Sequence, residues 1–326
     1  MVRMVVTDHI FADLEQERSA AAALGTELES FNVATEEETV EALRGANIAL
    51  VNFAPVTDAV LAAMAPGAVI VRYGIGYDNI DLEAADARGV SVCNVPDYGG
   101  DTVADHAVTL ALMLLRKVTQ FDRVLEAGEW TSPPALAPIL ASSQTTVGLF
   151  GTGRIGLAVA RRLQPFGFKV IAYDPFANQE TVREYGIELV PLDELFGRAH
   201  LVSLHAPATS ATYKIVNAGN LARMRPGSFI VNTARGSLVD QDAVLGALES
   251  GQLAGVGLDV FDPEPLPREH GLRRHPNAIL TPHAAFYSEQ SLQNLQRLAA
   301  EEAIRAGRGE KLRCLVNSPA LTTSNF

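Results

Sequence analysis

Short runs of β-branched and apolar residues alternate with longer stretches rich in Ala, Leu and Glu along the whole chain. The short runs predict strands at Met4–Thr7, Ile48–Asn52, Ala68–Arg72, Val90–Cys93, Thr146–Phe150, Lys169–Ala172, Leu201–Leu204, Ser228–Asn232, Gly255–Asp259 and Ala278–Leu280. The longer stretches predict helices at Leu14–Leu24, Glu36–Arg44, Asp58–Met64, Leu82–Arg88 and Asp240–Leu248. This alternation indicates parallel sheets that helices cover on both faces.

Two such sheets fit the length of the chain, because 326 residues have room for two domains of ordinary size. A long helical pattern from Thr102 to about Ala127 leads from a first α/β part to a second. A last helix at Glu289–Arg308 has no strand near it, so we expect it to pack back on the first part. The predicted fold class is α/β with two doubly wound parallel-sheet domains: a flavodoxin-like domain of residues 1–99 plus 290–326, and a Rossmann domain of residues 100–289.

A glycine-rich turn follows the strand predicted at Thr146–Phe150. It reads G-x-G-x-x-G at Gly151, Gly153 and Gly156, and a helical pattern, a second short strand and Asp174 come after it. This is the order of a dinucleotide-binding βαβ unit. Gly151 permits the tight turn, Gly153 lets the backbone approach a pyrophosphate, and Gly156 lets the helix pack closely on the strand. The free N–H groups of the helix N-terminus would hold the phosphates.

Composition narrows the classes of partner. The chain has 26 Lys and Arg against 38 Asp and Glu, and its net charge of −12 argues against a nucleic-acid backbone or an anionic membrane. Cys93 and Cys314 lie too far apart for a disulfide framework or a metal motif, and each is interpreted as a small buried hydrophobe. No signal-peptide core and no membrane-spanning stretch is visible, so we expect a cytoplasmic protein. Five histidines have no partner of metal-site spacing and are interpreted as structural or surface residues: His9, His106, His200, His270 and His275.

Charged side chains follow three predicted strands of the second half. Arg235 comes after the strand at Ser228–Asn232, Glu264 after the next strand, and His283 after the last one. Ligands of an open α/β sheet bind outside the carboxyl ends of its strands, so all three side chains lie on the nucleotide's side. Each has an ordinary alternative, as a surface charge, a turn acid and a helix-start residue respectively. Their occurrence together beside a dinucleotide site favours catalysis.

With these segments, the chain resembles the D-isomer-specific 2-hydroxyacid dehydrogenase family over essentially its whole length. The matching elements are Gly74–Asp81, Asn94–Pro96, Val103–His106, His205–Pro207, Thr233–Gly236, Asp262–Pro265 and Thr281–His283. Within the family, Tyr287–Gln290 and Cys314–Asn317 look closest to the C-terminal-binding-protein-like branch and its bacterial relatives. The resemblance implies an NAD-dependent oxidoreductase that transfers a hydride between nicotinamide and a D-2-hydroxyacid or 2-keto acid. Its active site would lie in the cleft between a substrate (catalytic) domain and the NAD-binding Rossmann domain, which hinge closure completes.

The resemblance implies catalytic roles for three residues. Arg235, with its planar paired donors, would hold the substrate carboxylate and polarise the carbonyl. His283 would give a proton to the forming alkoxide as the hydride arrives, and take it back in oxidation. Glu264, a carboxylate beside the imidazole, would orient the ring and favour its protonated form.

The resemblance also implies which residues hold cofactor and substrate. The cofactor NAD would be held by Gly151, Gly153, Arg154, Ile155, Gly156, Asp174, His205, Pro207, Thr212, Thr233, Ala234, Asp259 and Thr102. Asp174 would hold the adenosine ribose and Asp259 the nicotinamide carboxamide, whereas Thr102 is explained equally well as a helix N-cap. The substrate carboxylate would be bound by the backbone of Tyr73, Gly74, Ile75 and Gly76. Arg72 is a second carboxylate ligand or, equally, a solvent-facing strand end.

Two other functions stay open on the same scaffold. One is an NAD(H)-gated corepressor-like binding protein, and the other is oxidation of a phosphorus oxyanion such as phosphite. Glu264 argues against formate, because the family's formate dehydrogenases carry an amide at that position. Phe286 stands where the corepressor branch has a tryptophan, so the substrate pocket is not identical to that branch.

A homodimer is predicted through the helix region 102–127. The helical pattern is apolar on more than one face, at Val103, Ala107, Leu110, Ala111, Leu114, Leu115 and Val118. That exceeds what one small domain needs to cover, and the family resemblance points to the same helix. The alternative is a helix that is buried wholly within its own chain.

Overall fold

The structure is a computed structural model that describes residues 2–319. The chain forms two compact units. Among the described residues, unit 1 comprises 2–99 and 288–319, and unit 2 comprises Gly100–Tyr287. Each unit has its own sheet, as the alternation of strands and helices predicts.

Unit 1 is built on a parallel sheet of five strands. They are β1 (Met4–Val6), β2 (Leu28–Ser30), β3 (Ile48–Val51), β4 (Val69–Arg72) and β5 (Ser91–Cys93), in the order β2-β1-β3-β4-β5. All four strand pairs are parallel. This is the flavodoxin-like order, with its switch point between β1 and β3. The prediction of a doubly wound α/β fold is confirmed for this unit.

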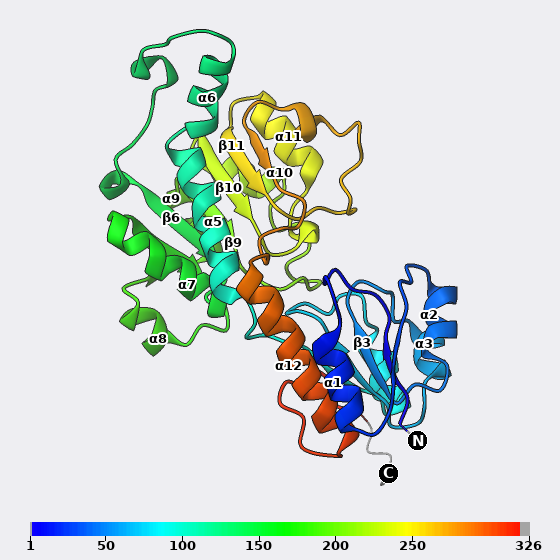
Figure 1. Ribbon diagram of the computed structural model, residues 1–326. Helices are drawn as coiled ribbons and strands as arrows, with labels where there is room; N and C mark the ends of the chain where they lie inside the picture. The colour runs from blue at the N-terminus through cyan, green and yellow to red at the C-terminus, as the bar shows by residue number, and fades with distance from the viewer. Residues whose placement is uncertain (1, 320–326) are drawn as a thin grey trace. The chain divides into compact units, whose positions relative to one another are not determined.

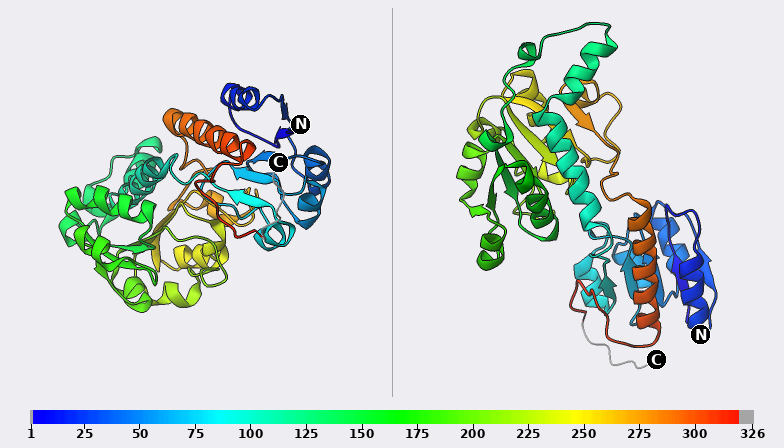
Figure 2. Two further views of the ribbon diagram at one scale, coloured as in Figure 1. Left: turned by 90° about the horizontal axis from the view of Figure 1, so that it is seen from below. Right: turned by 60° about the vertical axis from the view of Figure 1, so that its left-hand side comes forward.

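Helices cover both faces of this sheet (Figures 1 and 2). The helices α2 (Glu36–Leu43), α3 (Asp58–Ala63) and α4 (Leu82–Arg88) lie on one face, and α1 (Glu15–Ala23) and α12 (Glu289–Gly307) on the other. Ser288 begins α12 with a capping box, because its hydroxyl accepts from Ser291 N–H at 3.1 Å while the Ser291 hydroxyl accepts from Ser288 N–H at 2.8 Å. The helix α12 packs against α1, so the last helix of the chain lies beside the first.

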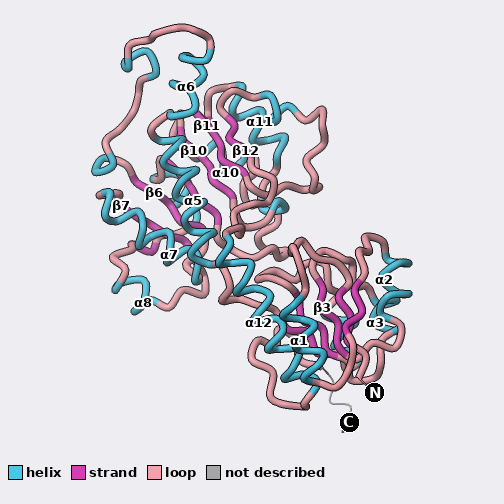
Figure 3. Tube along the Cα trace, in the orientation of Figure 1, coloured by secondary structure: helices cyan, strands magenta, loops and turns pink. Residues whose placement is uncertain are grey.

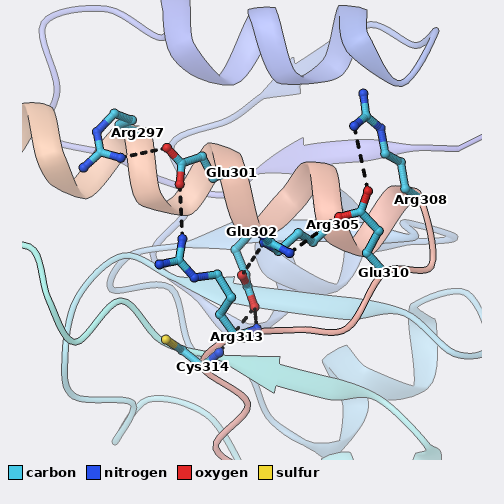
Figure 4. Close-up of polar contacts among 8 residues, drawn as sticks. All are labelled: Arg297, Glu301, Glu302, Arg305, Arg308, Glu310, Arg313 and Cys314. Atoms are coloured by element: carbon cyan, nitrogen blue, oxygen red, sulfur yellow. Dashed lines mark hydrogen bonds and ion pairs between the residues drawn. The ribbon is translucent and has the colours of Figure 1, made fainter.

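The segment after α12 is tied to that helix by charged side chains (Figure 4). The buried carboxylate of Glu302 accepts hydrogen bonds from the backbone N–H groups of Arg313 and Cys314, at 2.6 and 3.4 Å. Glu301 forms ion pairs with Arg297 and Arg313 at 2.7 and 3.3 Å. These contacts hold the segment on unit 1. Cys314 is only half-buried, which corrects the prediction of a buried residue.

Unit 2 is built on a parallel sheet of seven strands. They are β6 (Thr146–Phe150), β7 (Lys169–Tyr173), β8 (Glu188–Leu189), β9 (Leu201–Leu204), β10 (Ser228–Asn232), β11 (Leu253–Leu258) and β12 (Ala278–Leu280). Their order is β12-β11-β10-β9-β6-β7-β8. The order reverses between β6 and β9, and open sheets of the Rossmann type bind their ligands at this reversal. The glycine turn follows β6 and therefore lies at the switch point.

Two layers of helices cover the sheet of unit 2 (Figure 3). The helices are α5 (Gly100–Leu115), α6 (Val118–Glu126), α7 (Arg154–Leu163), α8 (Gln179–Glu184), α9 (Leu192–Arg198), α10 (Ala218–Arg223) and α11 (Gln241–Glu249). Single turns of 3-10 helix lie at Pro133–Leu136, Ser142–Gln144, Gln164–Phe166, Gly236–Leu238 and Gly271–Arg274. On β10, Phe229 and Val231 pack towards α5 and α7, whereas Ile230 packs towards α9, α10 and α11. Side chains that alternate in this way require apolar residues at every position of a central strand.

The predicted helix from Thr102 to about Ala127 is wrong as a single element. It is broken into α5 and α6, because Lys117 between them has a φ of 53°, in the left-handed region. Neither Gly nor Pro marks this break in the sequence, and the apolar periodicity continues across it, which is why a single helix was predicted. Thr102 lies inside the first turn of α5, which begins at Gly100, and is therefore not its N-cap.

The apolar side chains of α5 are covered by their own chain. Five of the residues that suggested a second partner are buried: Val103, Ala107, Leu110, Ala111 and Leu114. These five side chains therefore offer no face to a second partner, whereas Val118 from the same predicted set is exposed. Exposed apolar side chains lie instead on α6 and in the segment after it, at Val118, Leu125, Trp130 and Leu140.

Five shorter elements were not predicted, namely β2, β8, α8, α9 and α10. The strand β2 contains one apolar residue, Leu28, and β8 has only two residues. The three helices have six or seven residues each, a length at which a helical period is weak, although α3 and α4 are equally short and were predicted.

Candidate functional site

The glycine turn between β6 and α7 has the geometry of a dinucleotide site. Gly151 has a φ of 102°, and a Cβ atom there would lie 2.9 Å from the backbone carbon of His205. A Cβ on Gly156 would lie 2.2 Å from the carbonyl oxygen of Gly151, so the close contact of helix and turn requires glycine at both positions. A Cβ on Gly153, in contrast, would meet no protein atom within 4 Å. Nothing in the described chain demands glycine there, which leaves the close approach of a ligand as the physical reason.

Asp174 at the end of β7 holds this turn in place. One of its carboxylate oxygens accepts hydrogen bonds from the backbone N–H and the hydroxyl of Thr152, both at 2.8 Å. The other oxygen accepts from the N–H of Phe176 at 2.8 Å. The acid that follows the second strand is therefore packed against the turn, as the βαβ interpretation requires.

Two buried polar atoms beside the turn have no hydrogen-bond partner among residues 2–319. They are Nδ1 of His205, after β9, and Oγ1 of Thr233, after β10. The other ring nitrogen of His205 lies 2.9 Å from the hydroxyl of Ser203. Burial lowers the pKa of His205 to about 4, so its ring is neutral at pH 7. Unsatisfied buried polar atoms are expensive, and a bound dinucleotide with its many donors and acceptors fits them.

The remaining predicted cofactor residues lie around the same edge of the sheet. Arg154 and Ile155 form the first turn of α7. The hydroxyl of Thr212 donates to the carbonyl of Pro207 at 2.7 Å and thereby shapes the loop after β9. Ala234 follows β10, and its N–H donates to the side chain of Asn232 at 3.0 Å.

The loops that carry Arg235 and Glu264 are in close backbone contact. A Cβ on Gly236 would lie 1.9 Å from backbone atoms of Phe261, so only glycine permits this contact. The side-chain amide of Asn232, fully buried, donates to the carbonyl of Arg235 at 2.8 Å. The loops after β10 and β11 therefore meet at the carboxyl ends of their strands.

Glu264 and His283 form a hydrogen-bonded pair at this edge. His283 Nδ1 lies 2.8 Å from a carboxylate oxygen of Glu264, and the other oxygen accepts from the N–H of Phe261 at 2.8 Å. Burial pushes the pKa of Glu264 upward, but the hydrogen bond from His283 and the charges of His283 and Arg235 hold it below its usual value. Glu264 is thus ionised at neutral pH. The imidazole edge also faces the ring of Phe286, at 6.1 Å between centroids.

The backbone of His283 is strained. Its φ is 52°, which is uncommon outside glycine and costs about 1–3 kcal/mol. Asp259 holds this conformation from both sides, because its carbonyl accepts from His283 N–H at 2.7 Å and its carboxylate accepts from the N–H groups of Ala284 and Ala285 at 2.8 and 2.9 Å. Asp259 itself is fully buried. The structure thus places Asp259 as the anchor of the loop that carries His283.

In unit 1, Arg72 and Gly74 form a second candidate region. Gly74 has a φ of 133°, and one guanidinium nitrogen of Arg72 lies 1.9 Å from the point that a Cβ would occupy. The guanidinium carbon lies 5.9 Å from the ring centre of Phe53. Arg72 is therefore folded over the glycine loop at the end of β4, and the alternative of a strand end that simply faces solvent does not describe it.

The loop Tyr73–Gly76 offers fewer backbone donors than predicted. The N–H of Tyr73 donates to Val51 and that of Gly74 to Arg72, at 2.8 and 2.9 Å. Among residues 2–319, no acceptor is found for the amides of Ile75 and Gly76. The part of the loop that could hold a carboxylate is therefore narrower than the four residues predicted.

A buried carboxyl group supports this loop from behind. The hydroxyl of Tyr73 donates to Glu17 at 2.9 Å, and the side-chain amide of Gln296 donates to the other oxygen at 3.1 Å. Burial raises the pKa of Glu17, against these two hydrogen bonds. Glu17 was not predicted, since nothing near it in the sequence marks it as part of a site.

Two further residues of the site were missed. Asn232, which shapes the Arg235 loop, reads in the sequence as the end of a strand. His106 on α5 was interpreted as structural or surface, yet its Nε2 lies 3.0 Å from the hydroxyl of Thr281, beside Asp259. The one signal available was the position of His106 within a family-like motif.

Residues 2–319 contain neither a membrane-spanning helix nor a metal-binding cluster. In this range no helix is both long enough and apolar enough to span a membrane. The same range contains no group of three His, Cys, Asp or Glu side chains arranged to bind a metal ion.

Known proteins resemble this chain in sequence and in fold. Residues 108–285 match the family described as D-isomer specific 2-hydroxyacid dehydrogenase, NAD binding domain. A glyoxylate reductase of Korarchaeum cryptofilum is 39% identical over 253 residues, 76% of each chain. The structure of a glyoxylate reductase from Paecilomyes thermophila matches with a TM-score of 0.86 and 28% identity, over 97% of this chain and 98% of that one. A D-lactate dehydrogenase from Aquifex aeolicus, complexed with NAD and lactic acid, matches with a TM-score of 0.84 and 26% identity, over 98% and 100%. The chain therefore belongs to the D-isomer specific 2-hydroxyacid dehydrogenase family, as an oxidoreductase with an NAD-binding Rossmann domain.

Proposed function

We propose that the protein reduces a small 2-keto acid with NADH, and oxidises the D-2-hydroxyacid in reverse, with His283 as the acid and base. The observation that carries this proposal is the contact of 2.8 Å between His283 and Glu264, beside the Arg235 loop. The pair lies at the carboxyl ends of the Rossmann strands, where the cofactor binds. NADH, when bound, supplies the hydride.

The contact with Glu264 assigns the protons of His283. Because an ionised carboxylate only accepts, Nδ1 of His283 carries a hydrogen, and Nε2 is left to exchange a proton with the substrate. In reduction the imidazolium gives the Nε2 proton to the carbonyl oxygen while the carbonyl carbon receives the hydride. In oxidation the neutral Nε2 takes the hydroxyl proton. Glu264 favours the charged ring and keeps it oriented.

Arg235 is proposed to bind the substrate. Its guanidinium presents paired planar donors that match a carboxylate, and the same group polarises the neighbouring carbonyl oxygen. One of its nitrogens donates to the carbonyl of Ala234 at 2.6 Å, which orients the side chain within its loop. The backbone of Ile75 and Gly76, with Arg72, is proposed as a further carboxylate ligand.

The cofactor roles of individual residues are also proposals. We assign the adenosine ribose to Asp174, the pyrophosphate to the turn and Arg154, and the nicotinamide end to Thr233. The orphaned hydroxyl of Thr233 supports the last assignment. Asp259, unlike Asp174, is fully buried, and its carboxylate accepts three hydrogen bonds, so its proposed contact with the carboxamide is secondary to its role as an anchor.

A substrate screen tests the proposal. The full chain is assayed with NADH and glyoxylate, hydroxypyruvate or pyruvate, with glyoxylate first because relatives are named glyoxylate reductase. We expect turnover with at least one of these acids. Turnover near zero with tight NADH binding would instead support the corepressor-like binding protein, and reduction of NAD by phosphite would support the phosphite-type alternative. Membership of the C-terminal-binding-protein-like branch stays a hypothesis, since the relatives reported above are named glyoxylate reductase and D-lactate dehydrogenase.

The homodimer predicted from the sequence is proposed on a different surface of the region. The exposed apolar side chains of α6 and the following segment support it, above all Trp130, which is 90% exposed. Light scattering at micromolar concentration should give twice the chain mass, and a monomer mass would refute the dimer. The cytoplasmic location stays a prediction, which cell fractionation would test.

A further inference from the structure

We propose that His106 is a positioning residue for the catalytic loop. Its imidazole orients the hydroxyl of Thr281, which in turn orients the carboxylate of Asp259 that holds His283. The inference rests on the proposed role of His283. It assigns a task to a side chain that touches neither substrate nor cofactor in the proposed reaction.

The hydrogen bonds around Thr281 have a fixed direction. Thr281 Oγ1 lies 2.5 Å from Asp259 Oδ1 and 3.0 Å from His106 Nε2. A threonine hydroxyl has one proton, and the carboxylate of Asp259 can only accept it. His106 must therefore donate from Nε2 to the oxygen of Thr281. The geometry thus assigns the tautomer of His106 and a chain of donors that runs from α5 to Asp259.

The end of this chain controls the loop after β12. Oδ1 of Asp259 accepts from both the Thr281 hydroxyl and the Ala284 N–H, while Oδ2 accepts from the Ala285 N–H. The hydroxyl is the one side-chain donor of the three and adds to the restriction on rotation of the carboxyl group. His283 lies between these contacts in a left-handed conformation, which persists only where its surroundings over-determine it.

Loss of the donor chain should therefore displace the imidazole of His283 without removing any reacting group. The side chain of His106 lies on α5 and is 25% exposed. An apolar residue could pack in its place but could not direct the hydroxyl of Thr281. Mutual support among hydrogen bonds of this kind makes single deletions non-additive.

Two matched pairs of variants test the inference. Thr281→Val removes the hydroxyl at nearly constant shape, and Thr281→Ser keeps it. His106→Leu removes the donor, and His106→Gln keeps an N–H group near the position of Nε2. For reduction of glyoxylate we expect kcat to fall about tenfold or more in the Val and Leu variants, because small displacements of a reacting group are costly. The Ser and Gln variants should stay within about threefold of the parent, and the dissociation constant of NADH within about twofold in all four.

A second readout needs no substrate. In the ligand-free protein, hydrogen exchange at the amides of Ala284 and Ala285 should be faster in Thr281→Val and His106→Leu than in the parent, Ser and Gln proteins. The double variant Thr281→Val with His106→Leu should exchange these amides no faster than Thr281→Val alone. Parental kcat and parental exchange in His106→Leu would overturn the inference, as would equal loss of kcat in His106→Leu and His106→Gln. If His283→Ala kept parental turnover, the proposed function would fail. The exchange measurement would still show whether His106 and Thr281 hold the carboxylate of Asp259 in place.

Discussion

Glu17 in unit 1 and Glu264 in unit 2 are the same residue type with pKa values shifted in opposite directions. Glu17 is fully buried, whereas the side chain of Glu264 is 36% exposed, and for both, burial is the strongest influence on the pKa. The pKa of Glu17 is raised, although hydrogen bonds from the backbone, the Tyr73 hydroxyl and the Gln296 amide lower it, as does, least of all, the charge of His9. Glu264 has the hydrogen bond and the charge of His283 and the charge of Arg235, and its pKa is lowered.

The main difference between the two carboxyl groups is the histidine that is hydrogen-bonded to Glu264. Hydrogen bonds from neutral groups do not offset the loss of hydration at Glu17, whereas charged partners do so at Glu264. The carboxyl group with the raised pKa ties a tyrosine and a glutamine together. A carboxylate that stays ionised is suited to stabilise an imidazolium. The comparison thus separates a carboxyl group with a structural role in unit 1 from a carboxylate proposed to stabilise a charge in unit 2.

The largest expected effect comes from removal of the histidine beside Glu264. His283→Ala should lower kcat by roughly 10²–10⁴, the usual worth of a positioned acid–base group, with NADH binding nearly unchanged. Steady-state kinetics with the best substrate and a fluorescence titration with NADH give the two numbers. Near-parental turnover would show that the assigned role is wrong.

Arg235→Ala removes the other cation near Glu264 and should damage both KM and kcat. The guanidinium is proposed to hold the carboxylate and to polarise the carbonyl, so both binding and chemistry lose an interaction. The matched control is Arg235→Lys, which keeps the charge but not the paired planar donors, and should recover only part of the loss. Full activity in Arg235→Ala would remove this residue from the site.

Asp174 extends the comparison to a carboxylate that is proposed to bind the cofactor directly. It should favour NADH over NADPH by at least about tenfold, or roughly 1.4 kcal/mol, because it repels a 2′-phosphate. The next residues, Pro175, Phe176 and Ala177, offer no cation to offset that repulsion. Asp174→Ala should narrow the ratio of the two kcat/KM values, mainly through the KM of the cofactor. Equal efficiency of the parent with NADPH would contradict the assignment.

The smallest expected effect concerns Glu17 and appears in stability. Because folding raises its pKa, the proton that Glu17 binds stabilises the folded state at low pH, and this contribution is lost as pH rises through the folded-state pKa. Glu17→Gln keeps a hydrogen-bonding group and cannot ionise. Its Tm relative to the parent should therefore rise with increasing pH, by on the order of a few degrees. A Tm difference that is constant from pH 4 to pH 9 would contradict the raised pKa.

The features that were predictable from the sequence are those that local chemistry determines. The turn at Gly151–Gly156 and the acid Asp174 are marked by residue type, spacing and the strands around them. The strands β6, β9, β10 and β12 were predicted at the bounds that the structure has, since buried parallel strands are continuous apolar runs. The break at Lys117 was missed, because its left-handed conformation has no marker in the sequence.

The supporting contacts were not predictable, because they join residues far apart in the chain. His106 and Thr281 are 175 positions apart, and Glu17 and Tyr73 are 56 apart. Such pairs depend on how helices cover the sheets rather than on any local pattern. The expectation for the loop Tyr73–Gly76 failed in part for a similar reason, since a sequence does not show which amides are already engaged.

The most direct test of the account is the pH profile of kcat/KM for keto-acid reduction, in the parent and in Glu264→Gln. In the proposed mechanism the imidazolium of His283 gives the proton for reduction, so we expect activity to fall as pH rises. Glu264 is ionised and stabilises that charge, whereas glutamine keeps a hydrogen-bonding group without the charge. The account predicts that the alkaline limb of the profile moves to lower pH in Glu264→Gln. A limb that stays in place or moves to higher pH would contradict it.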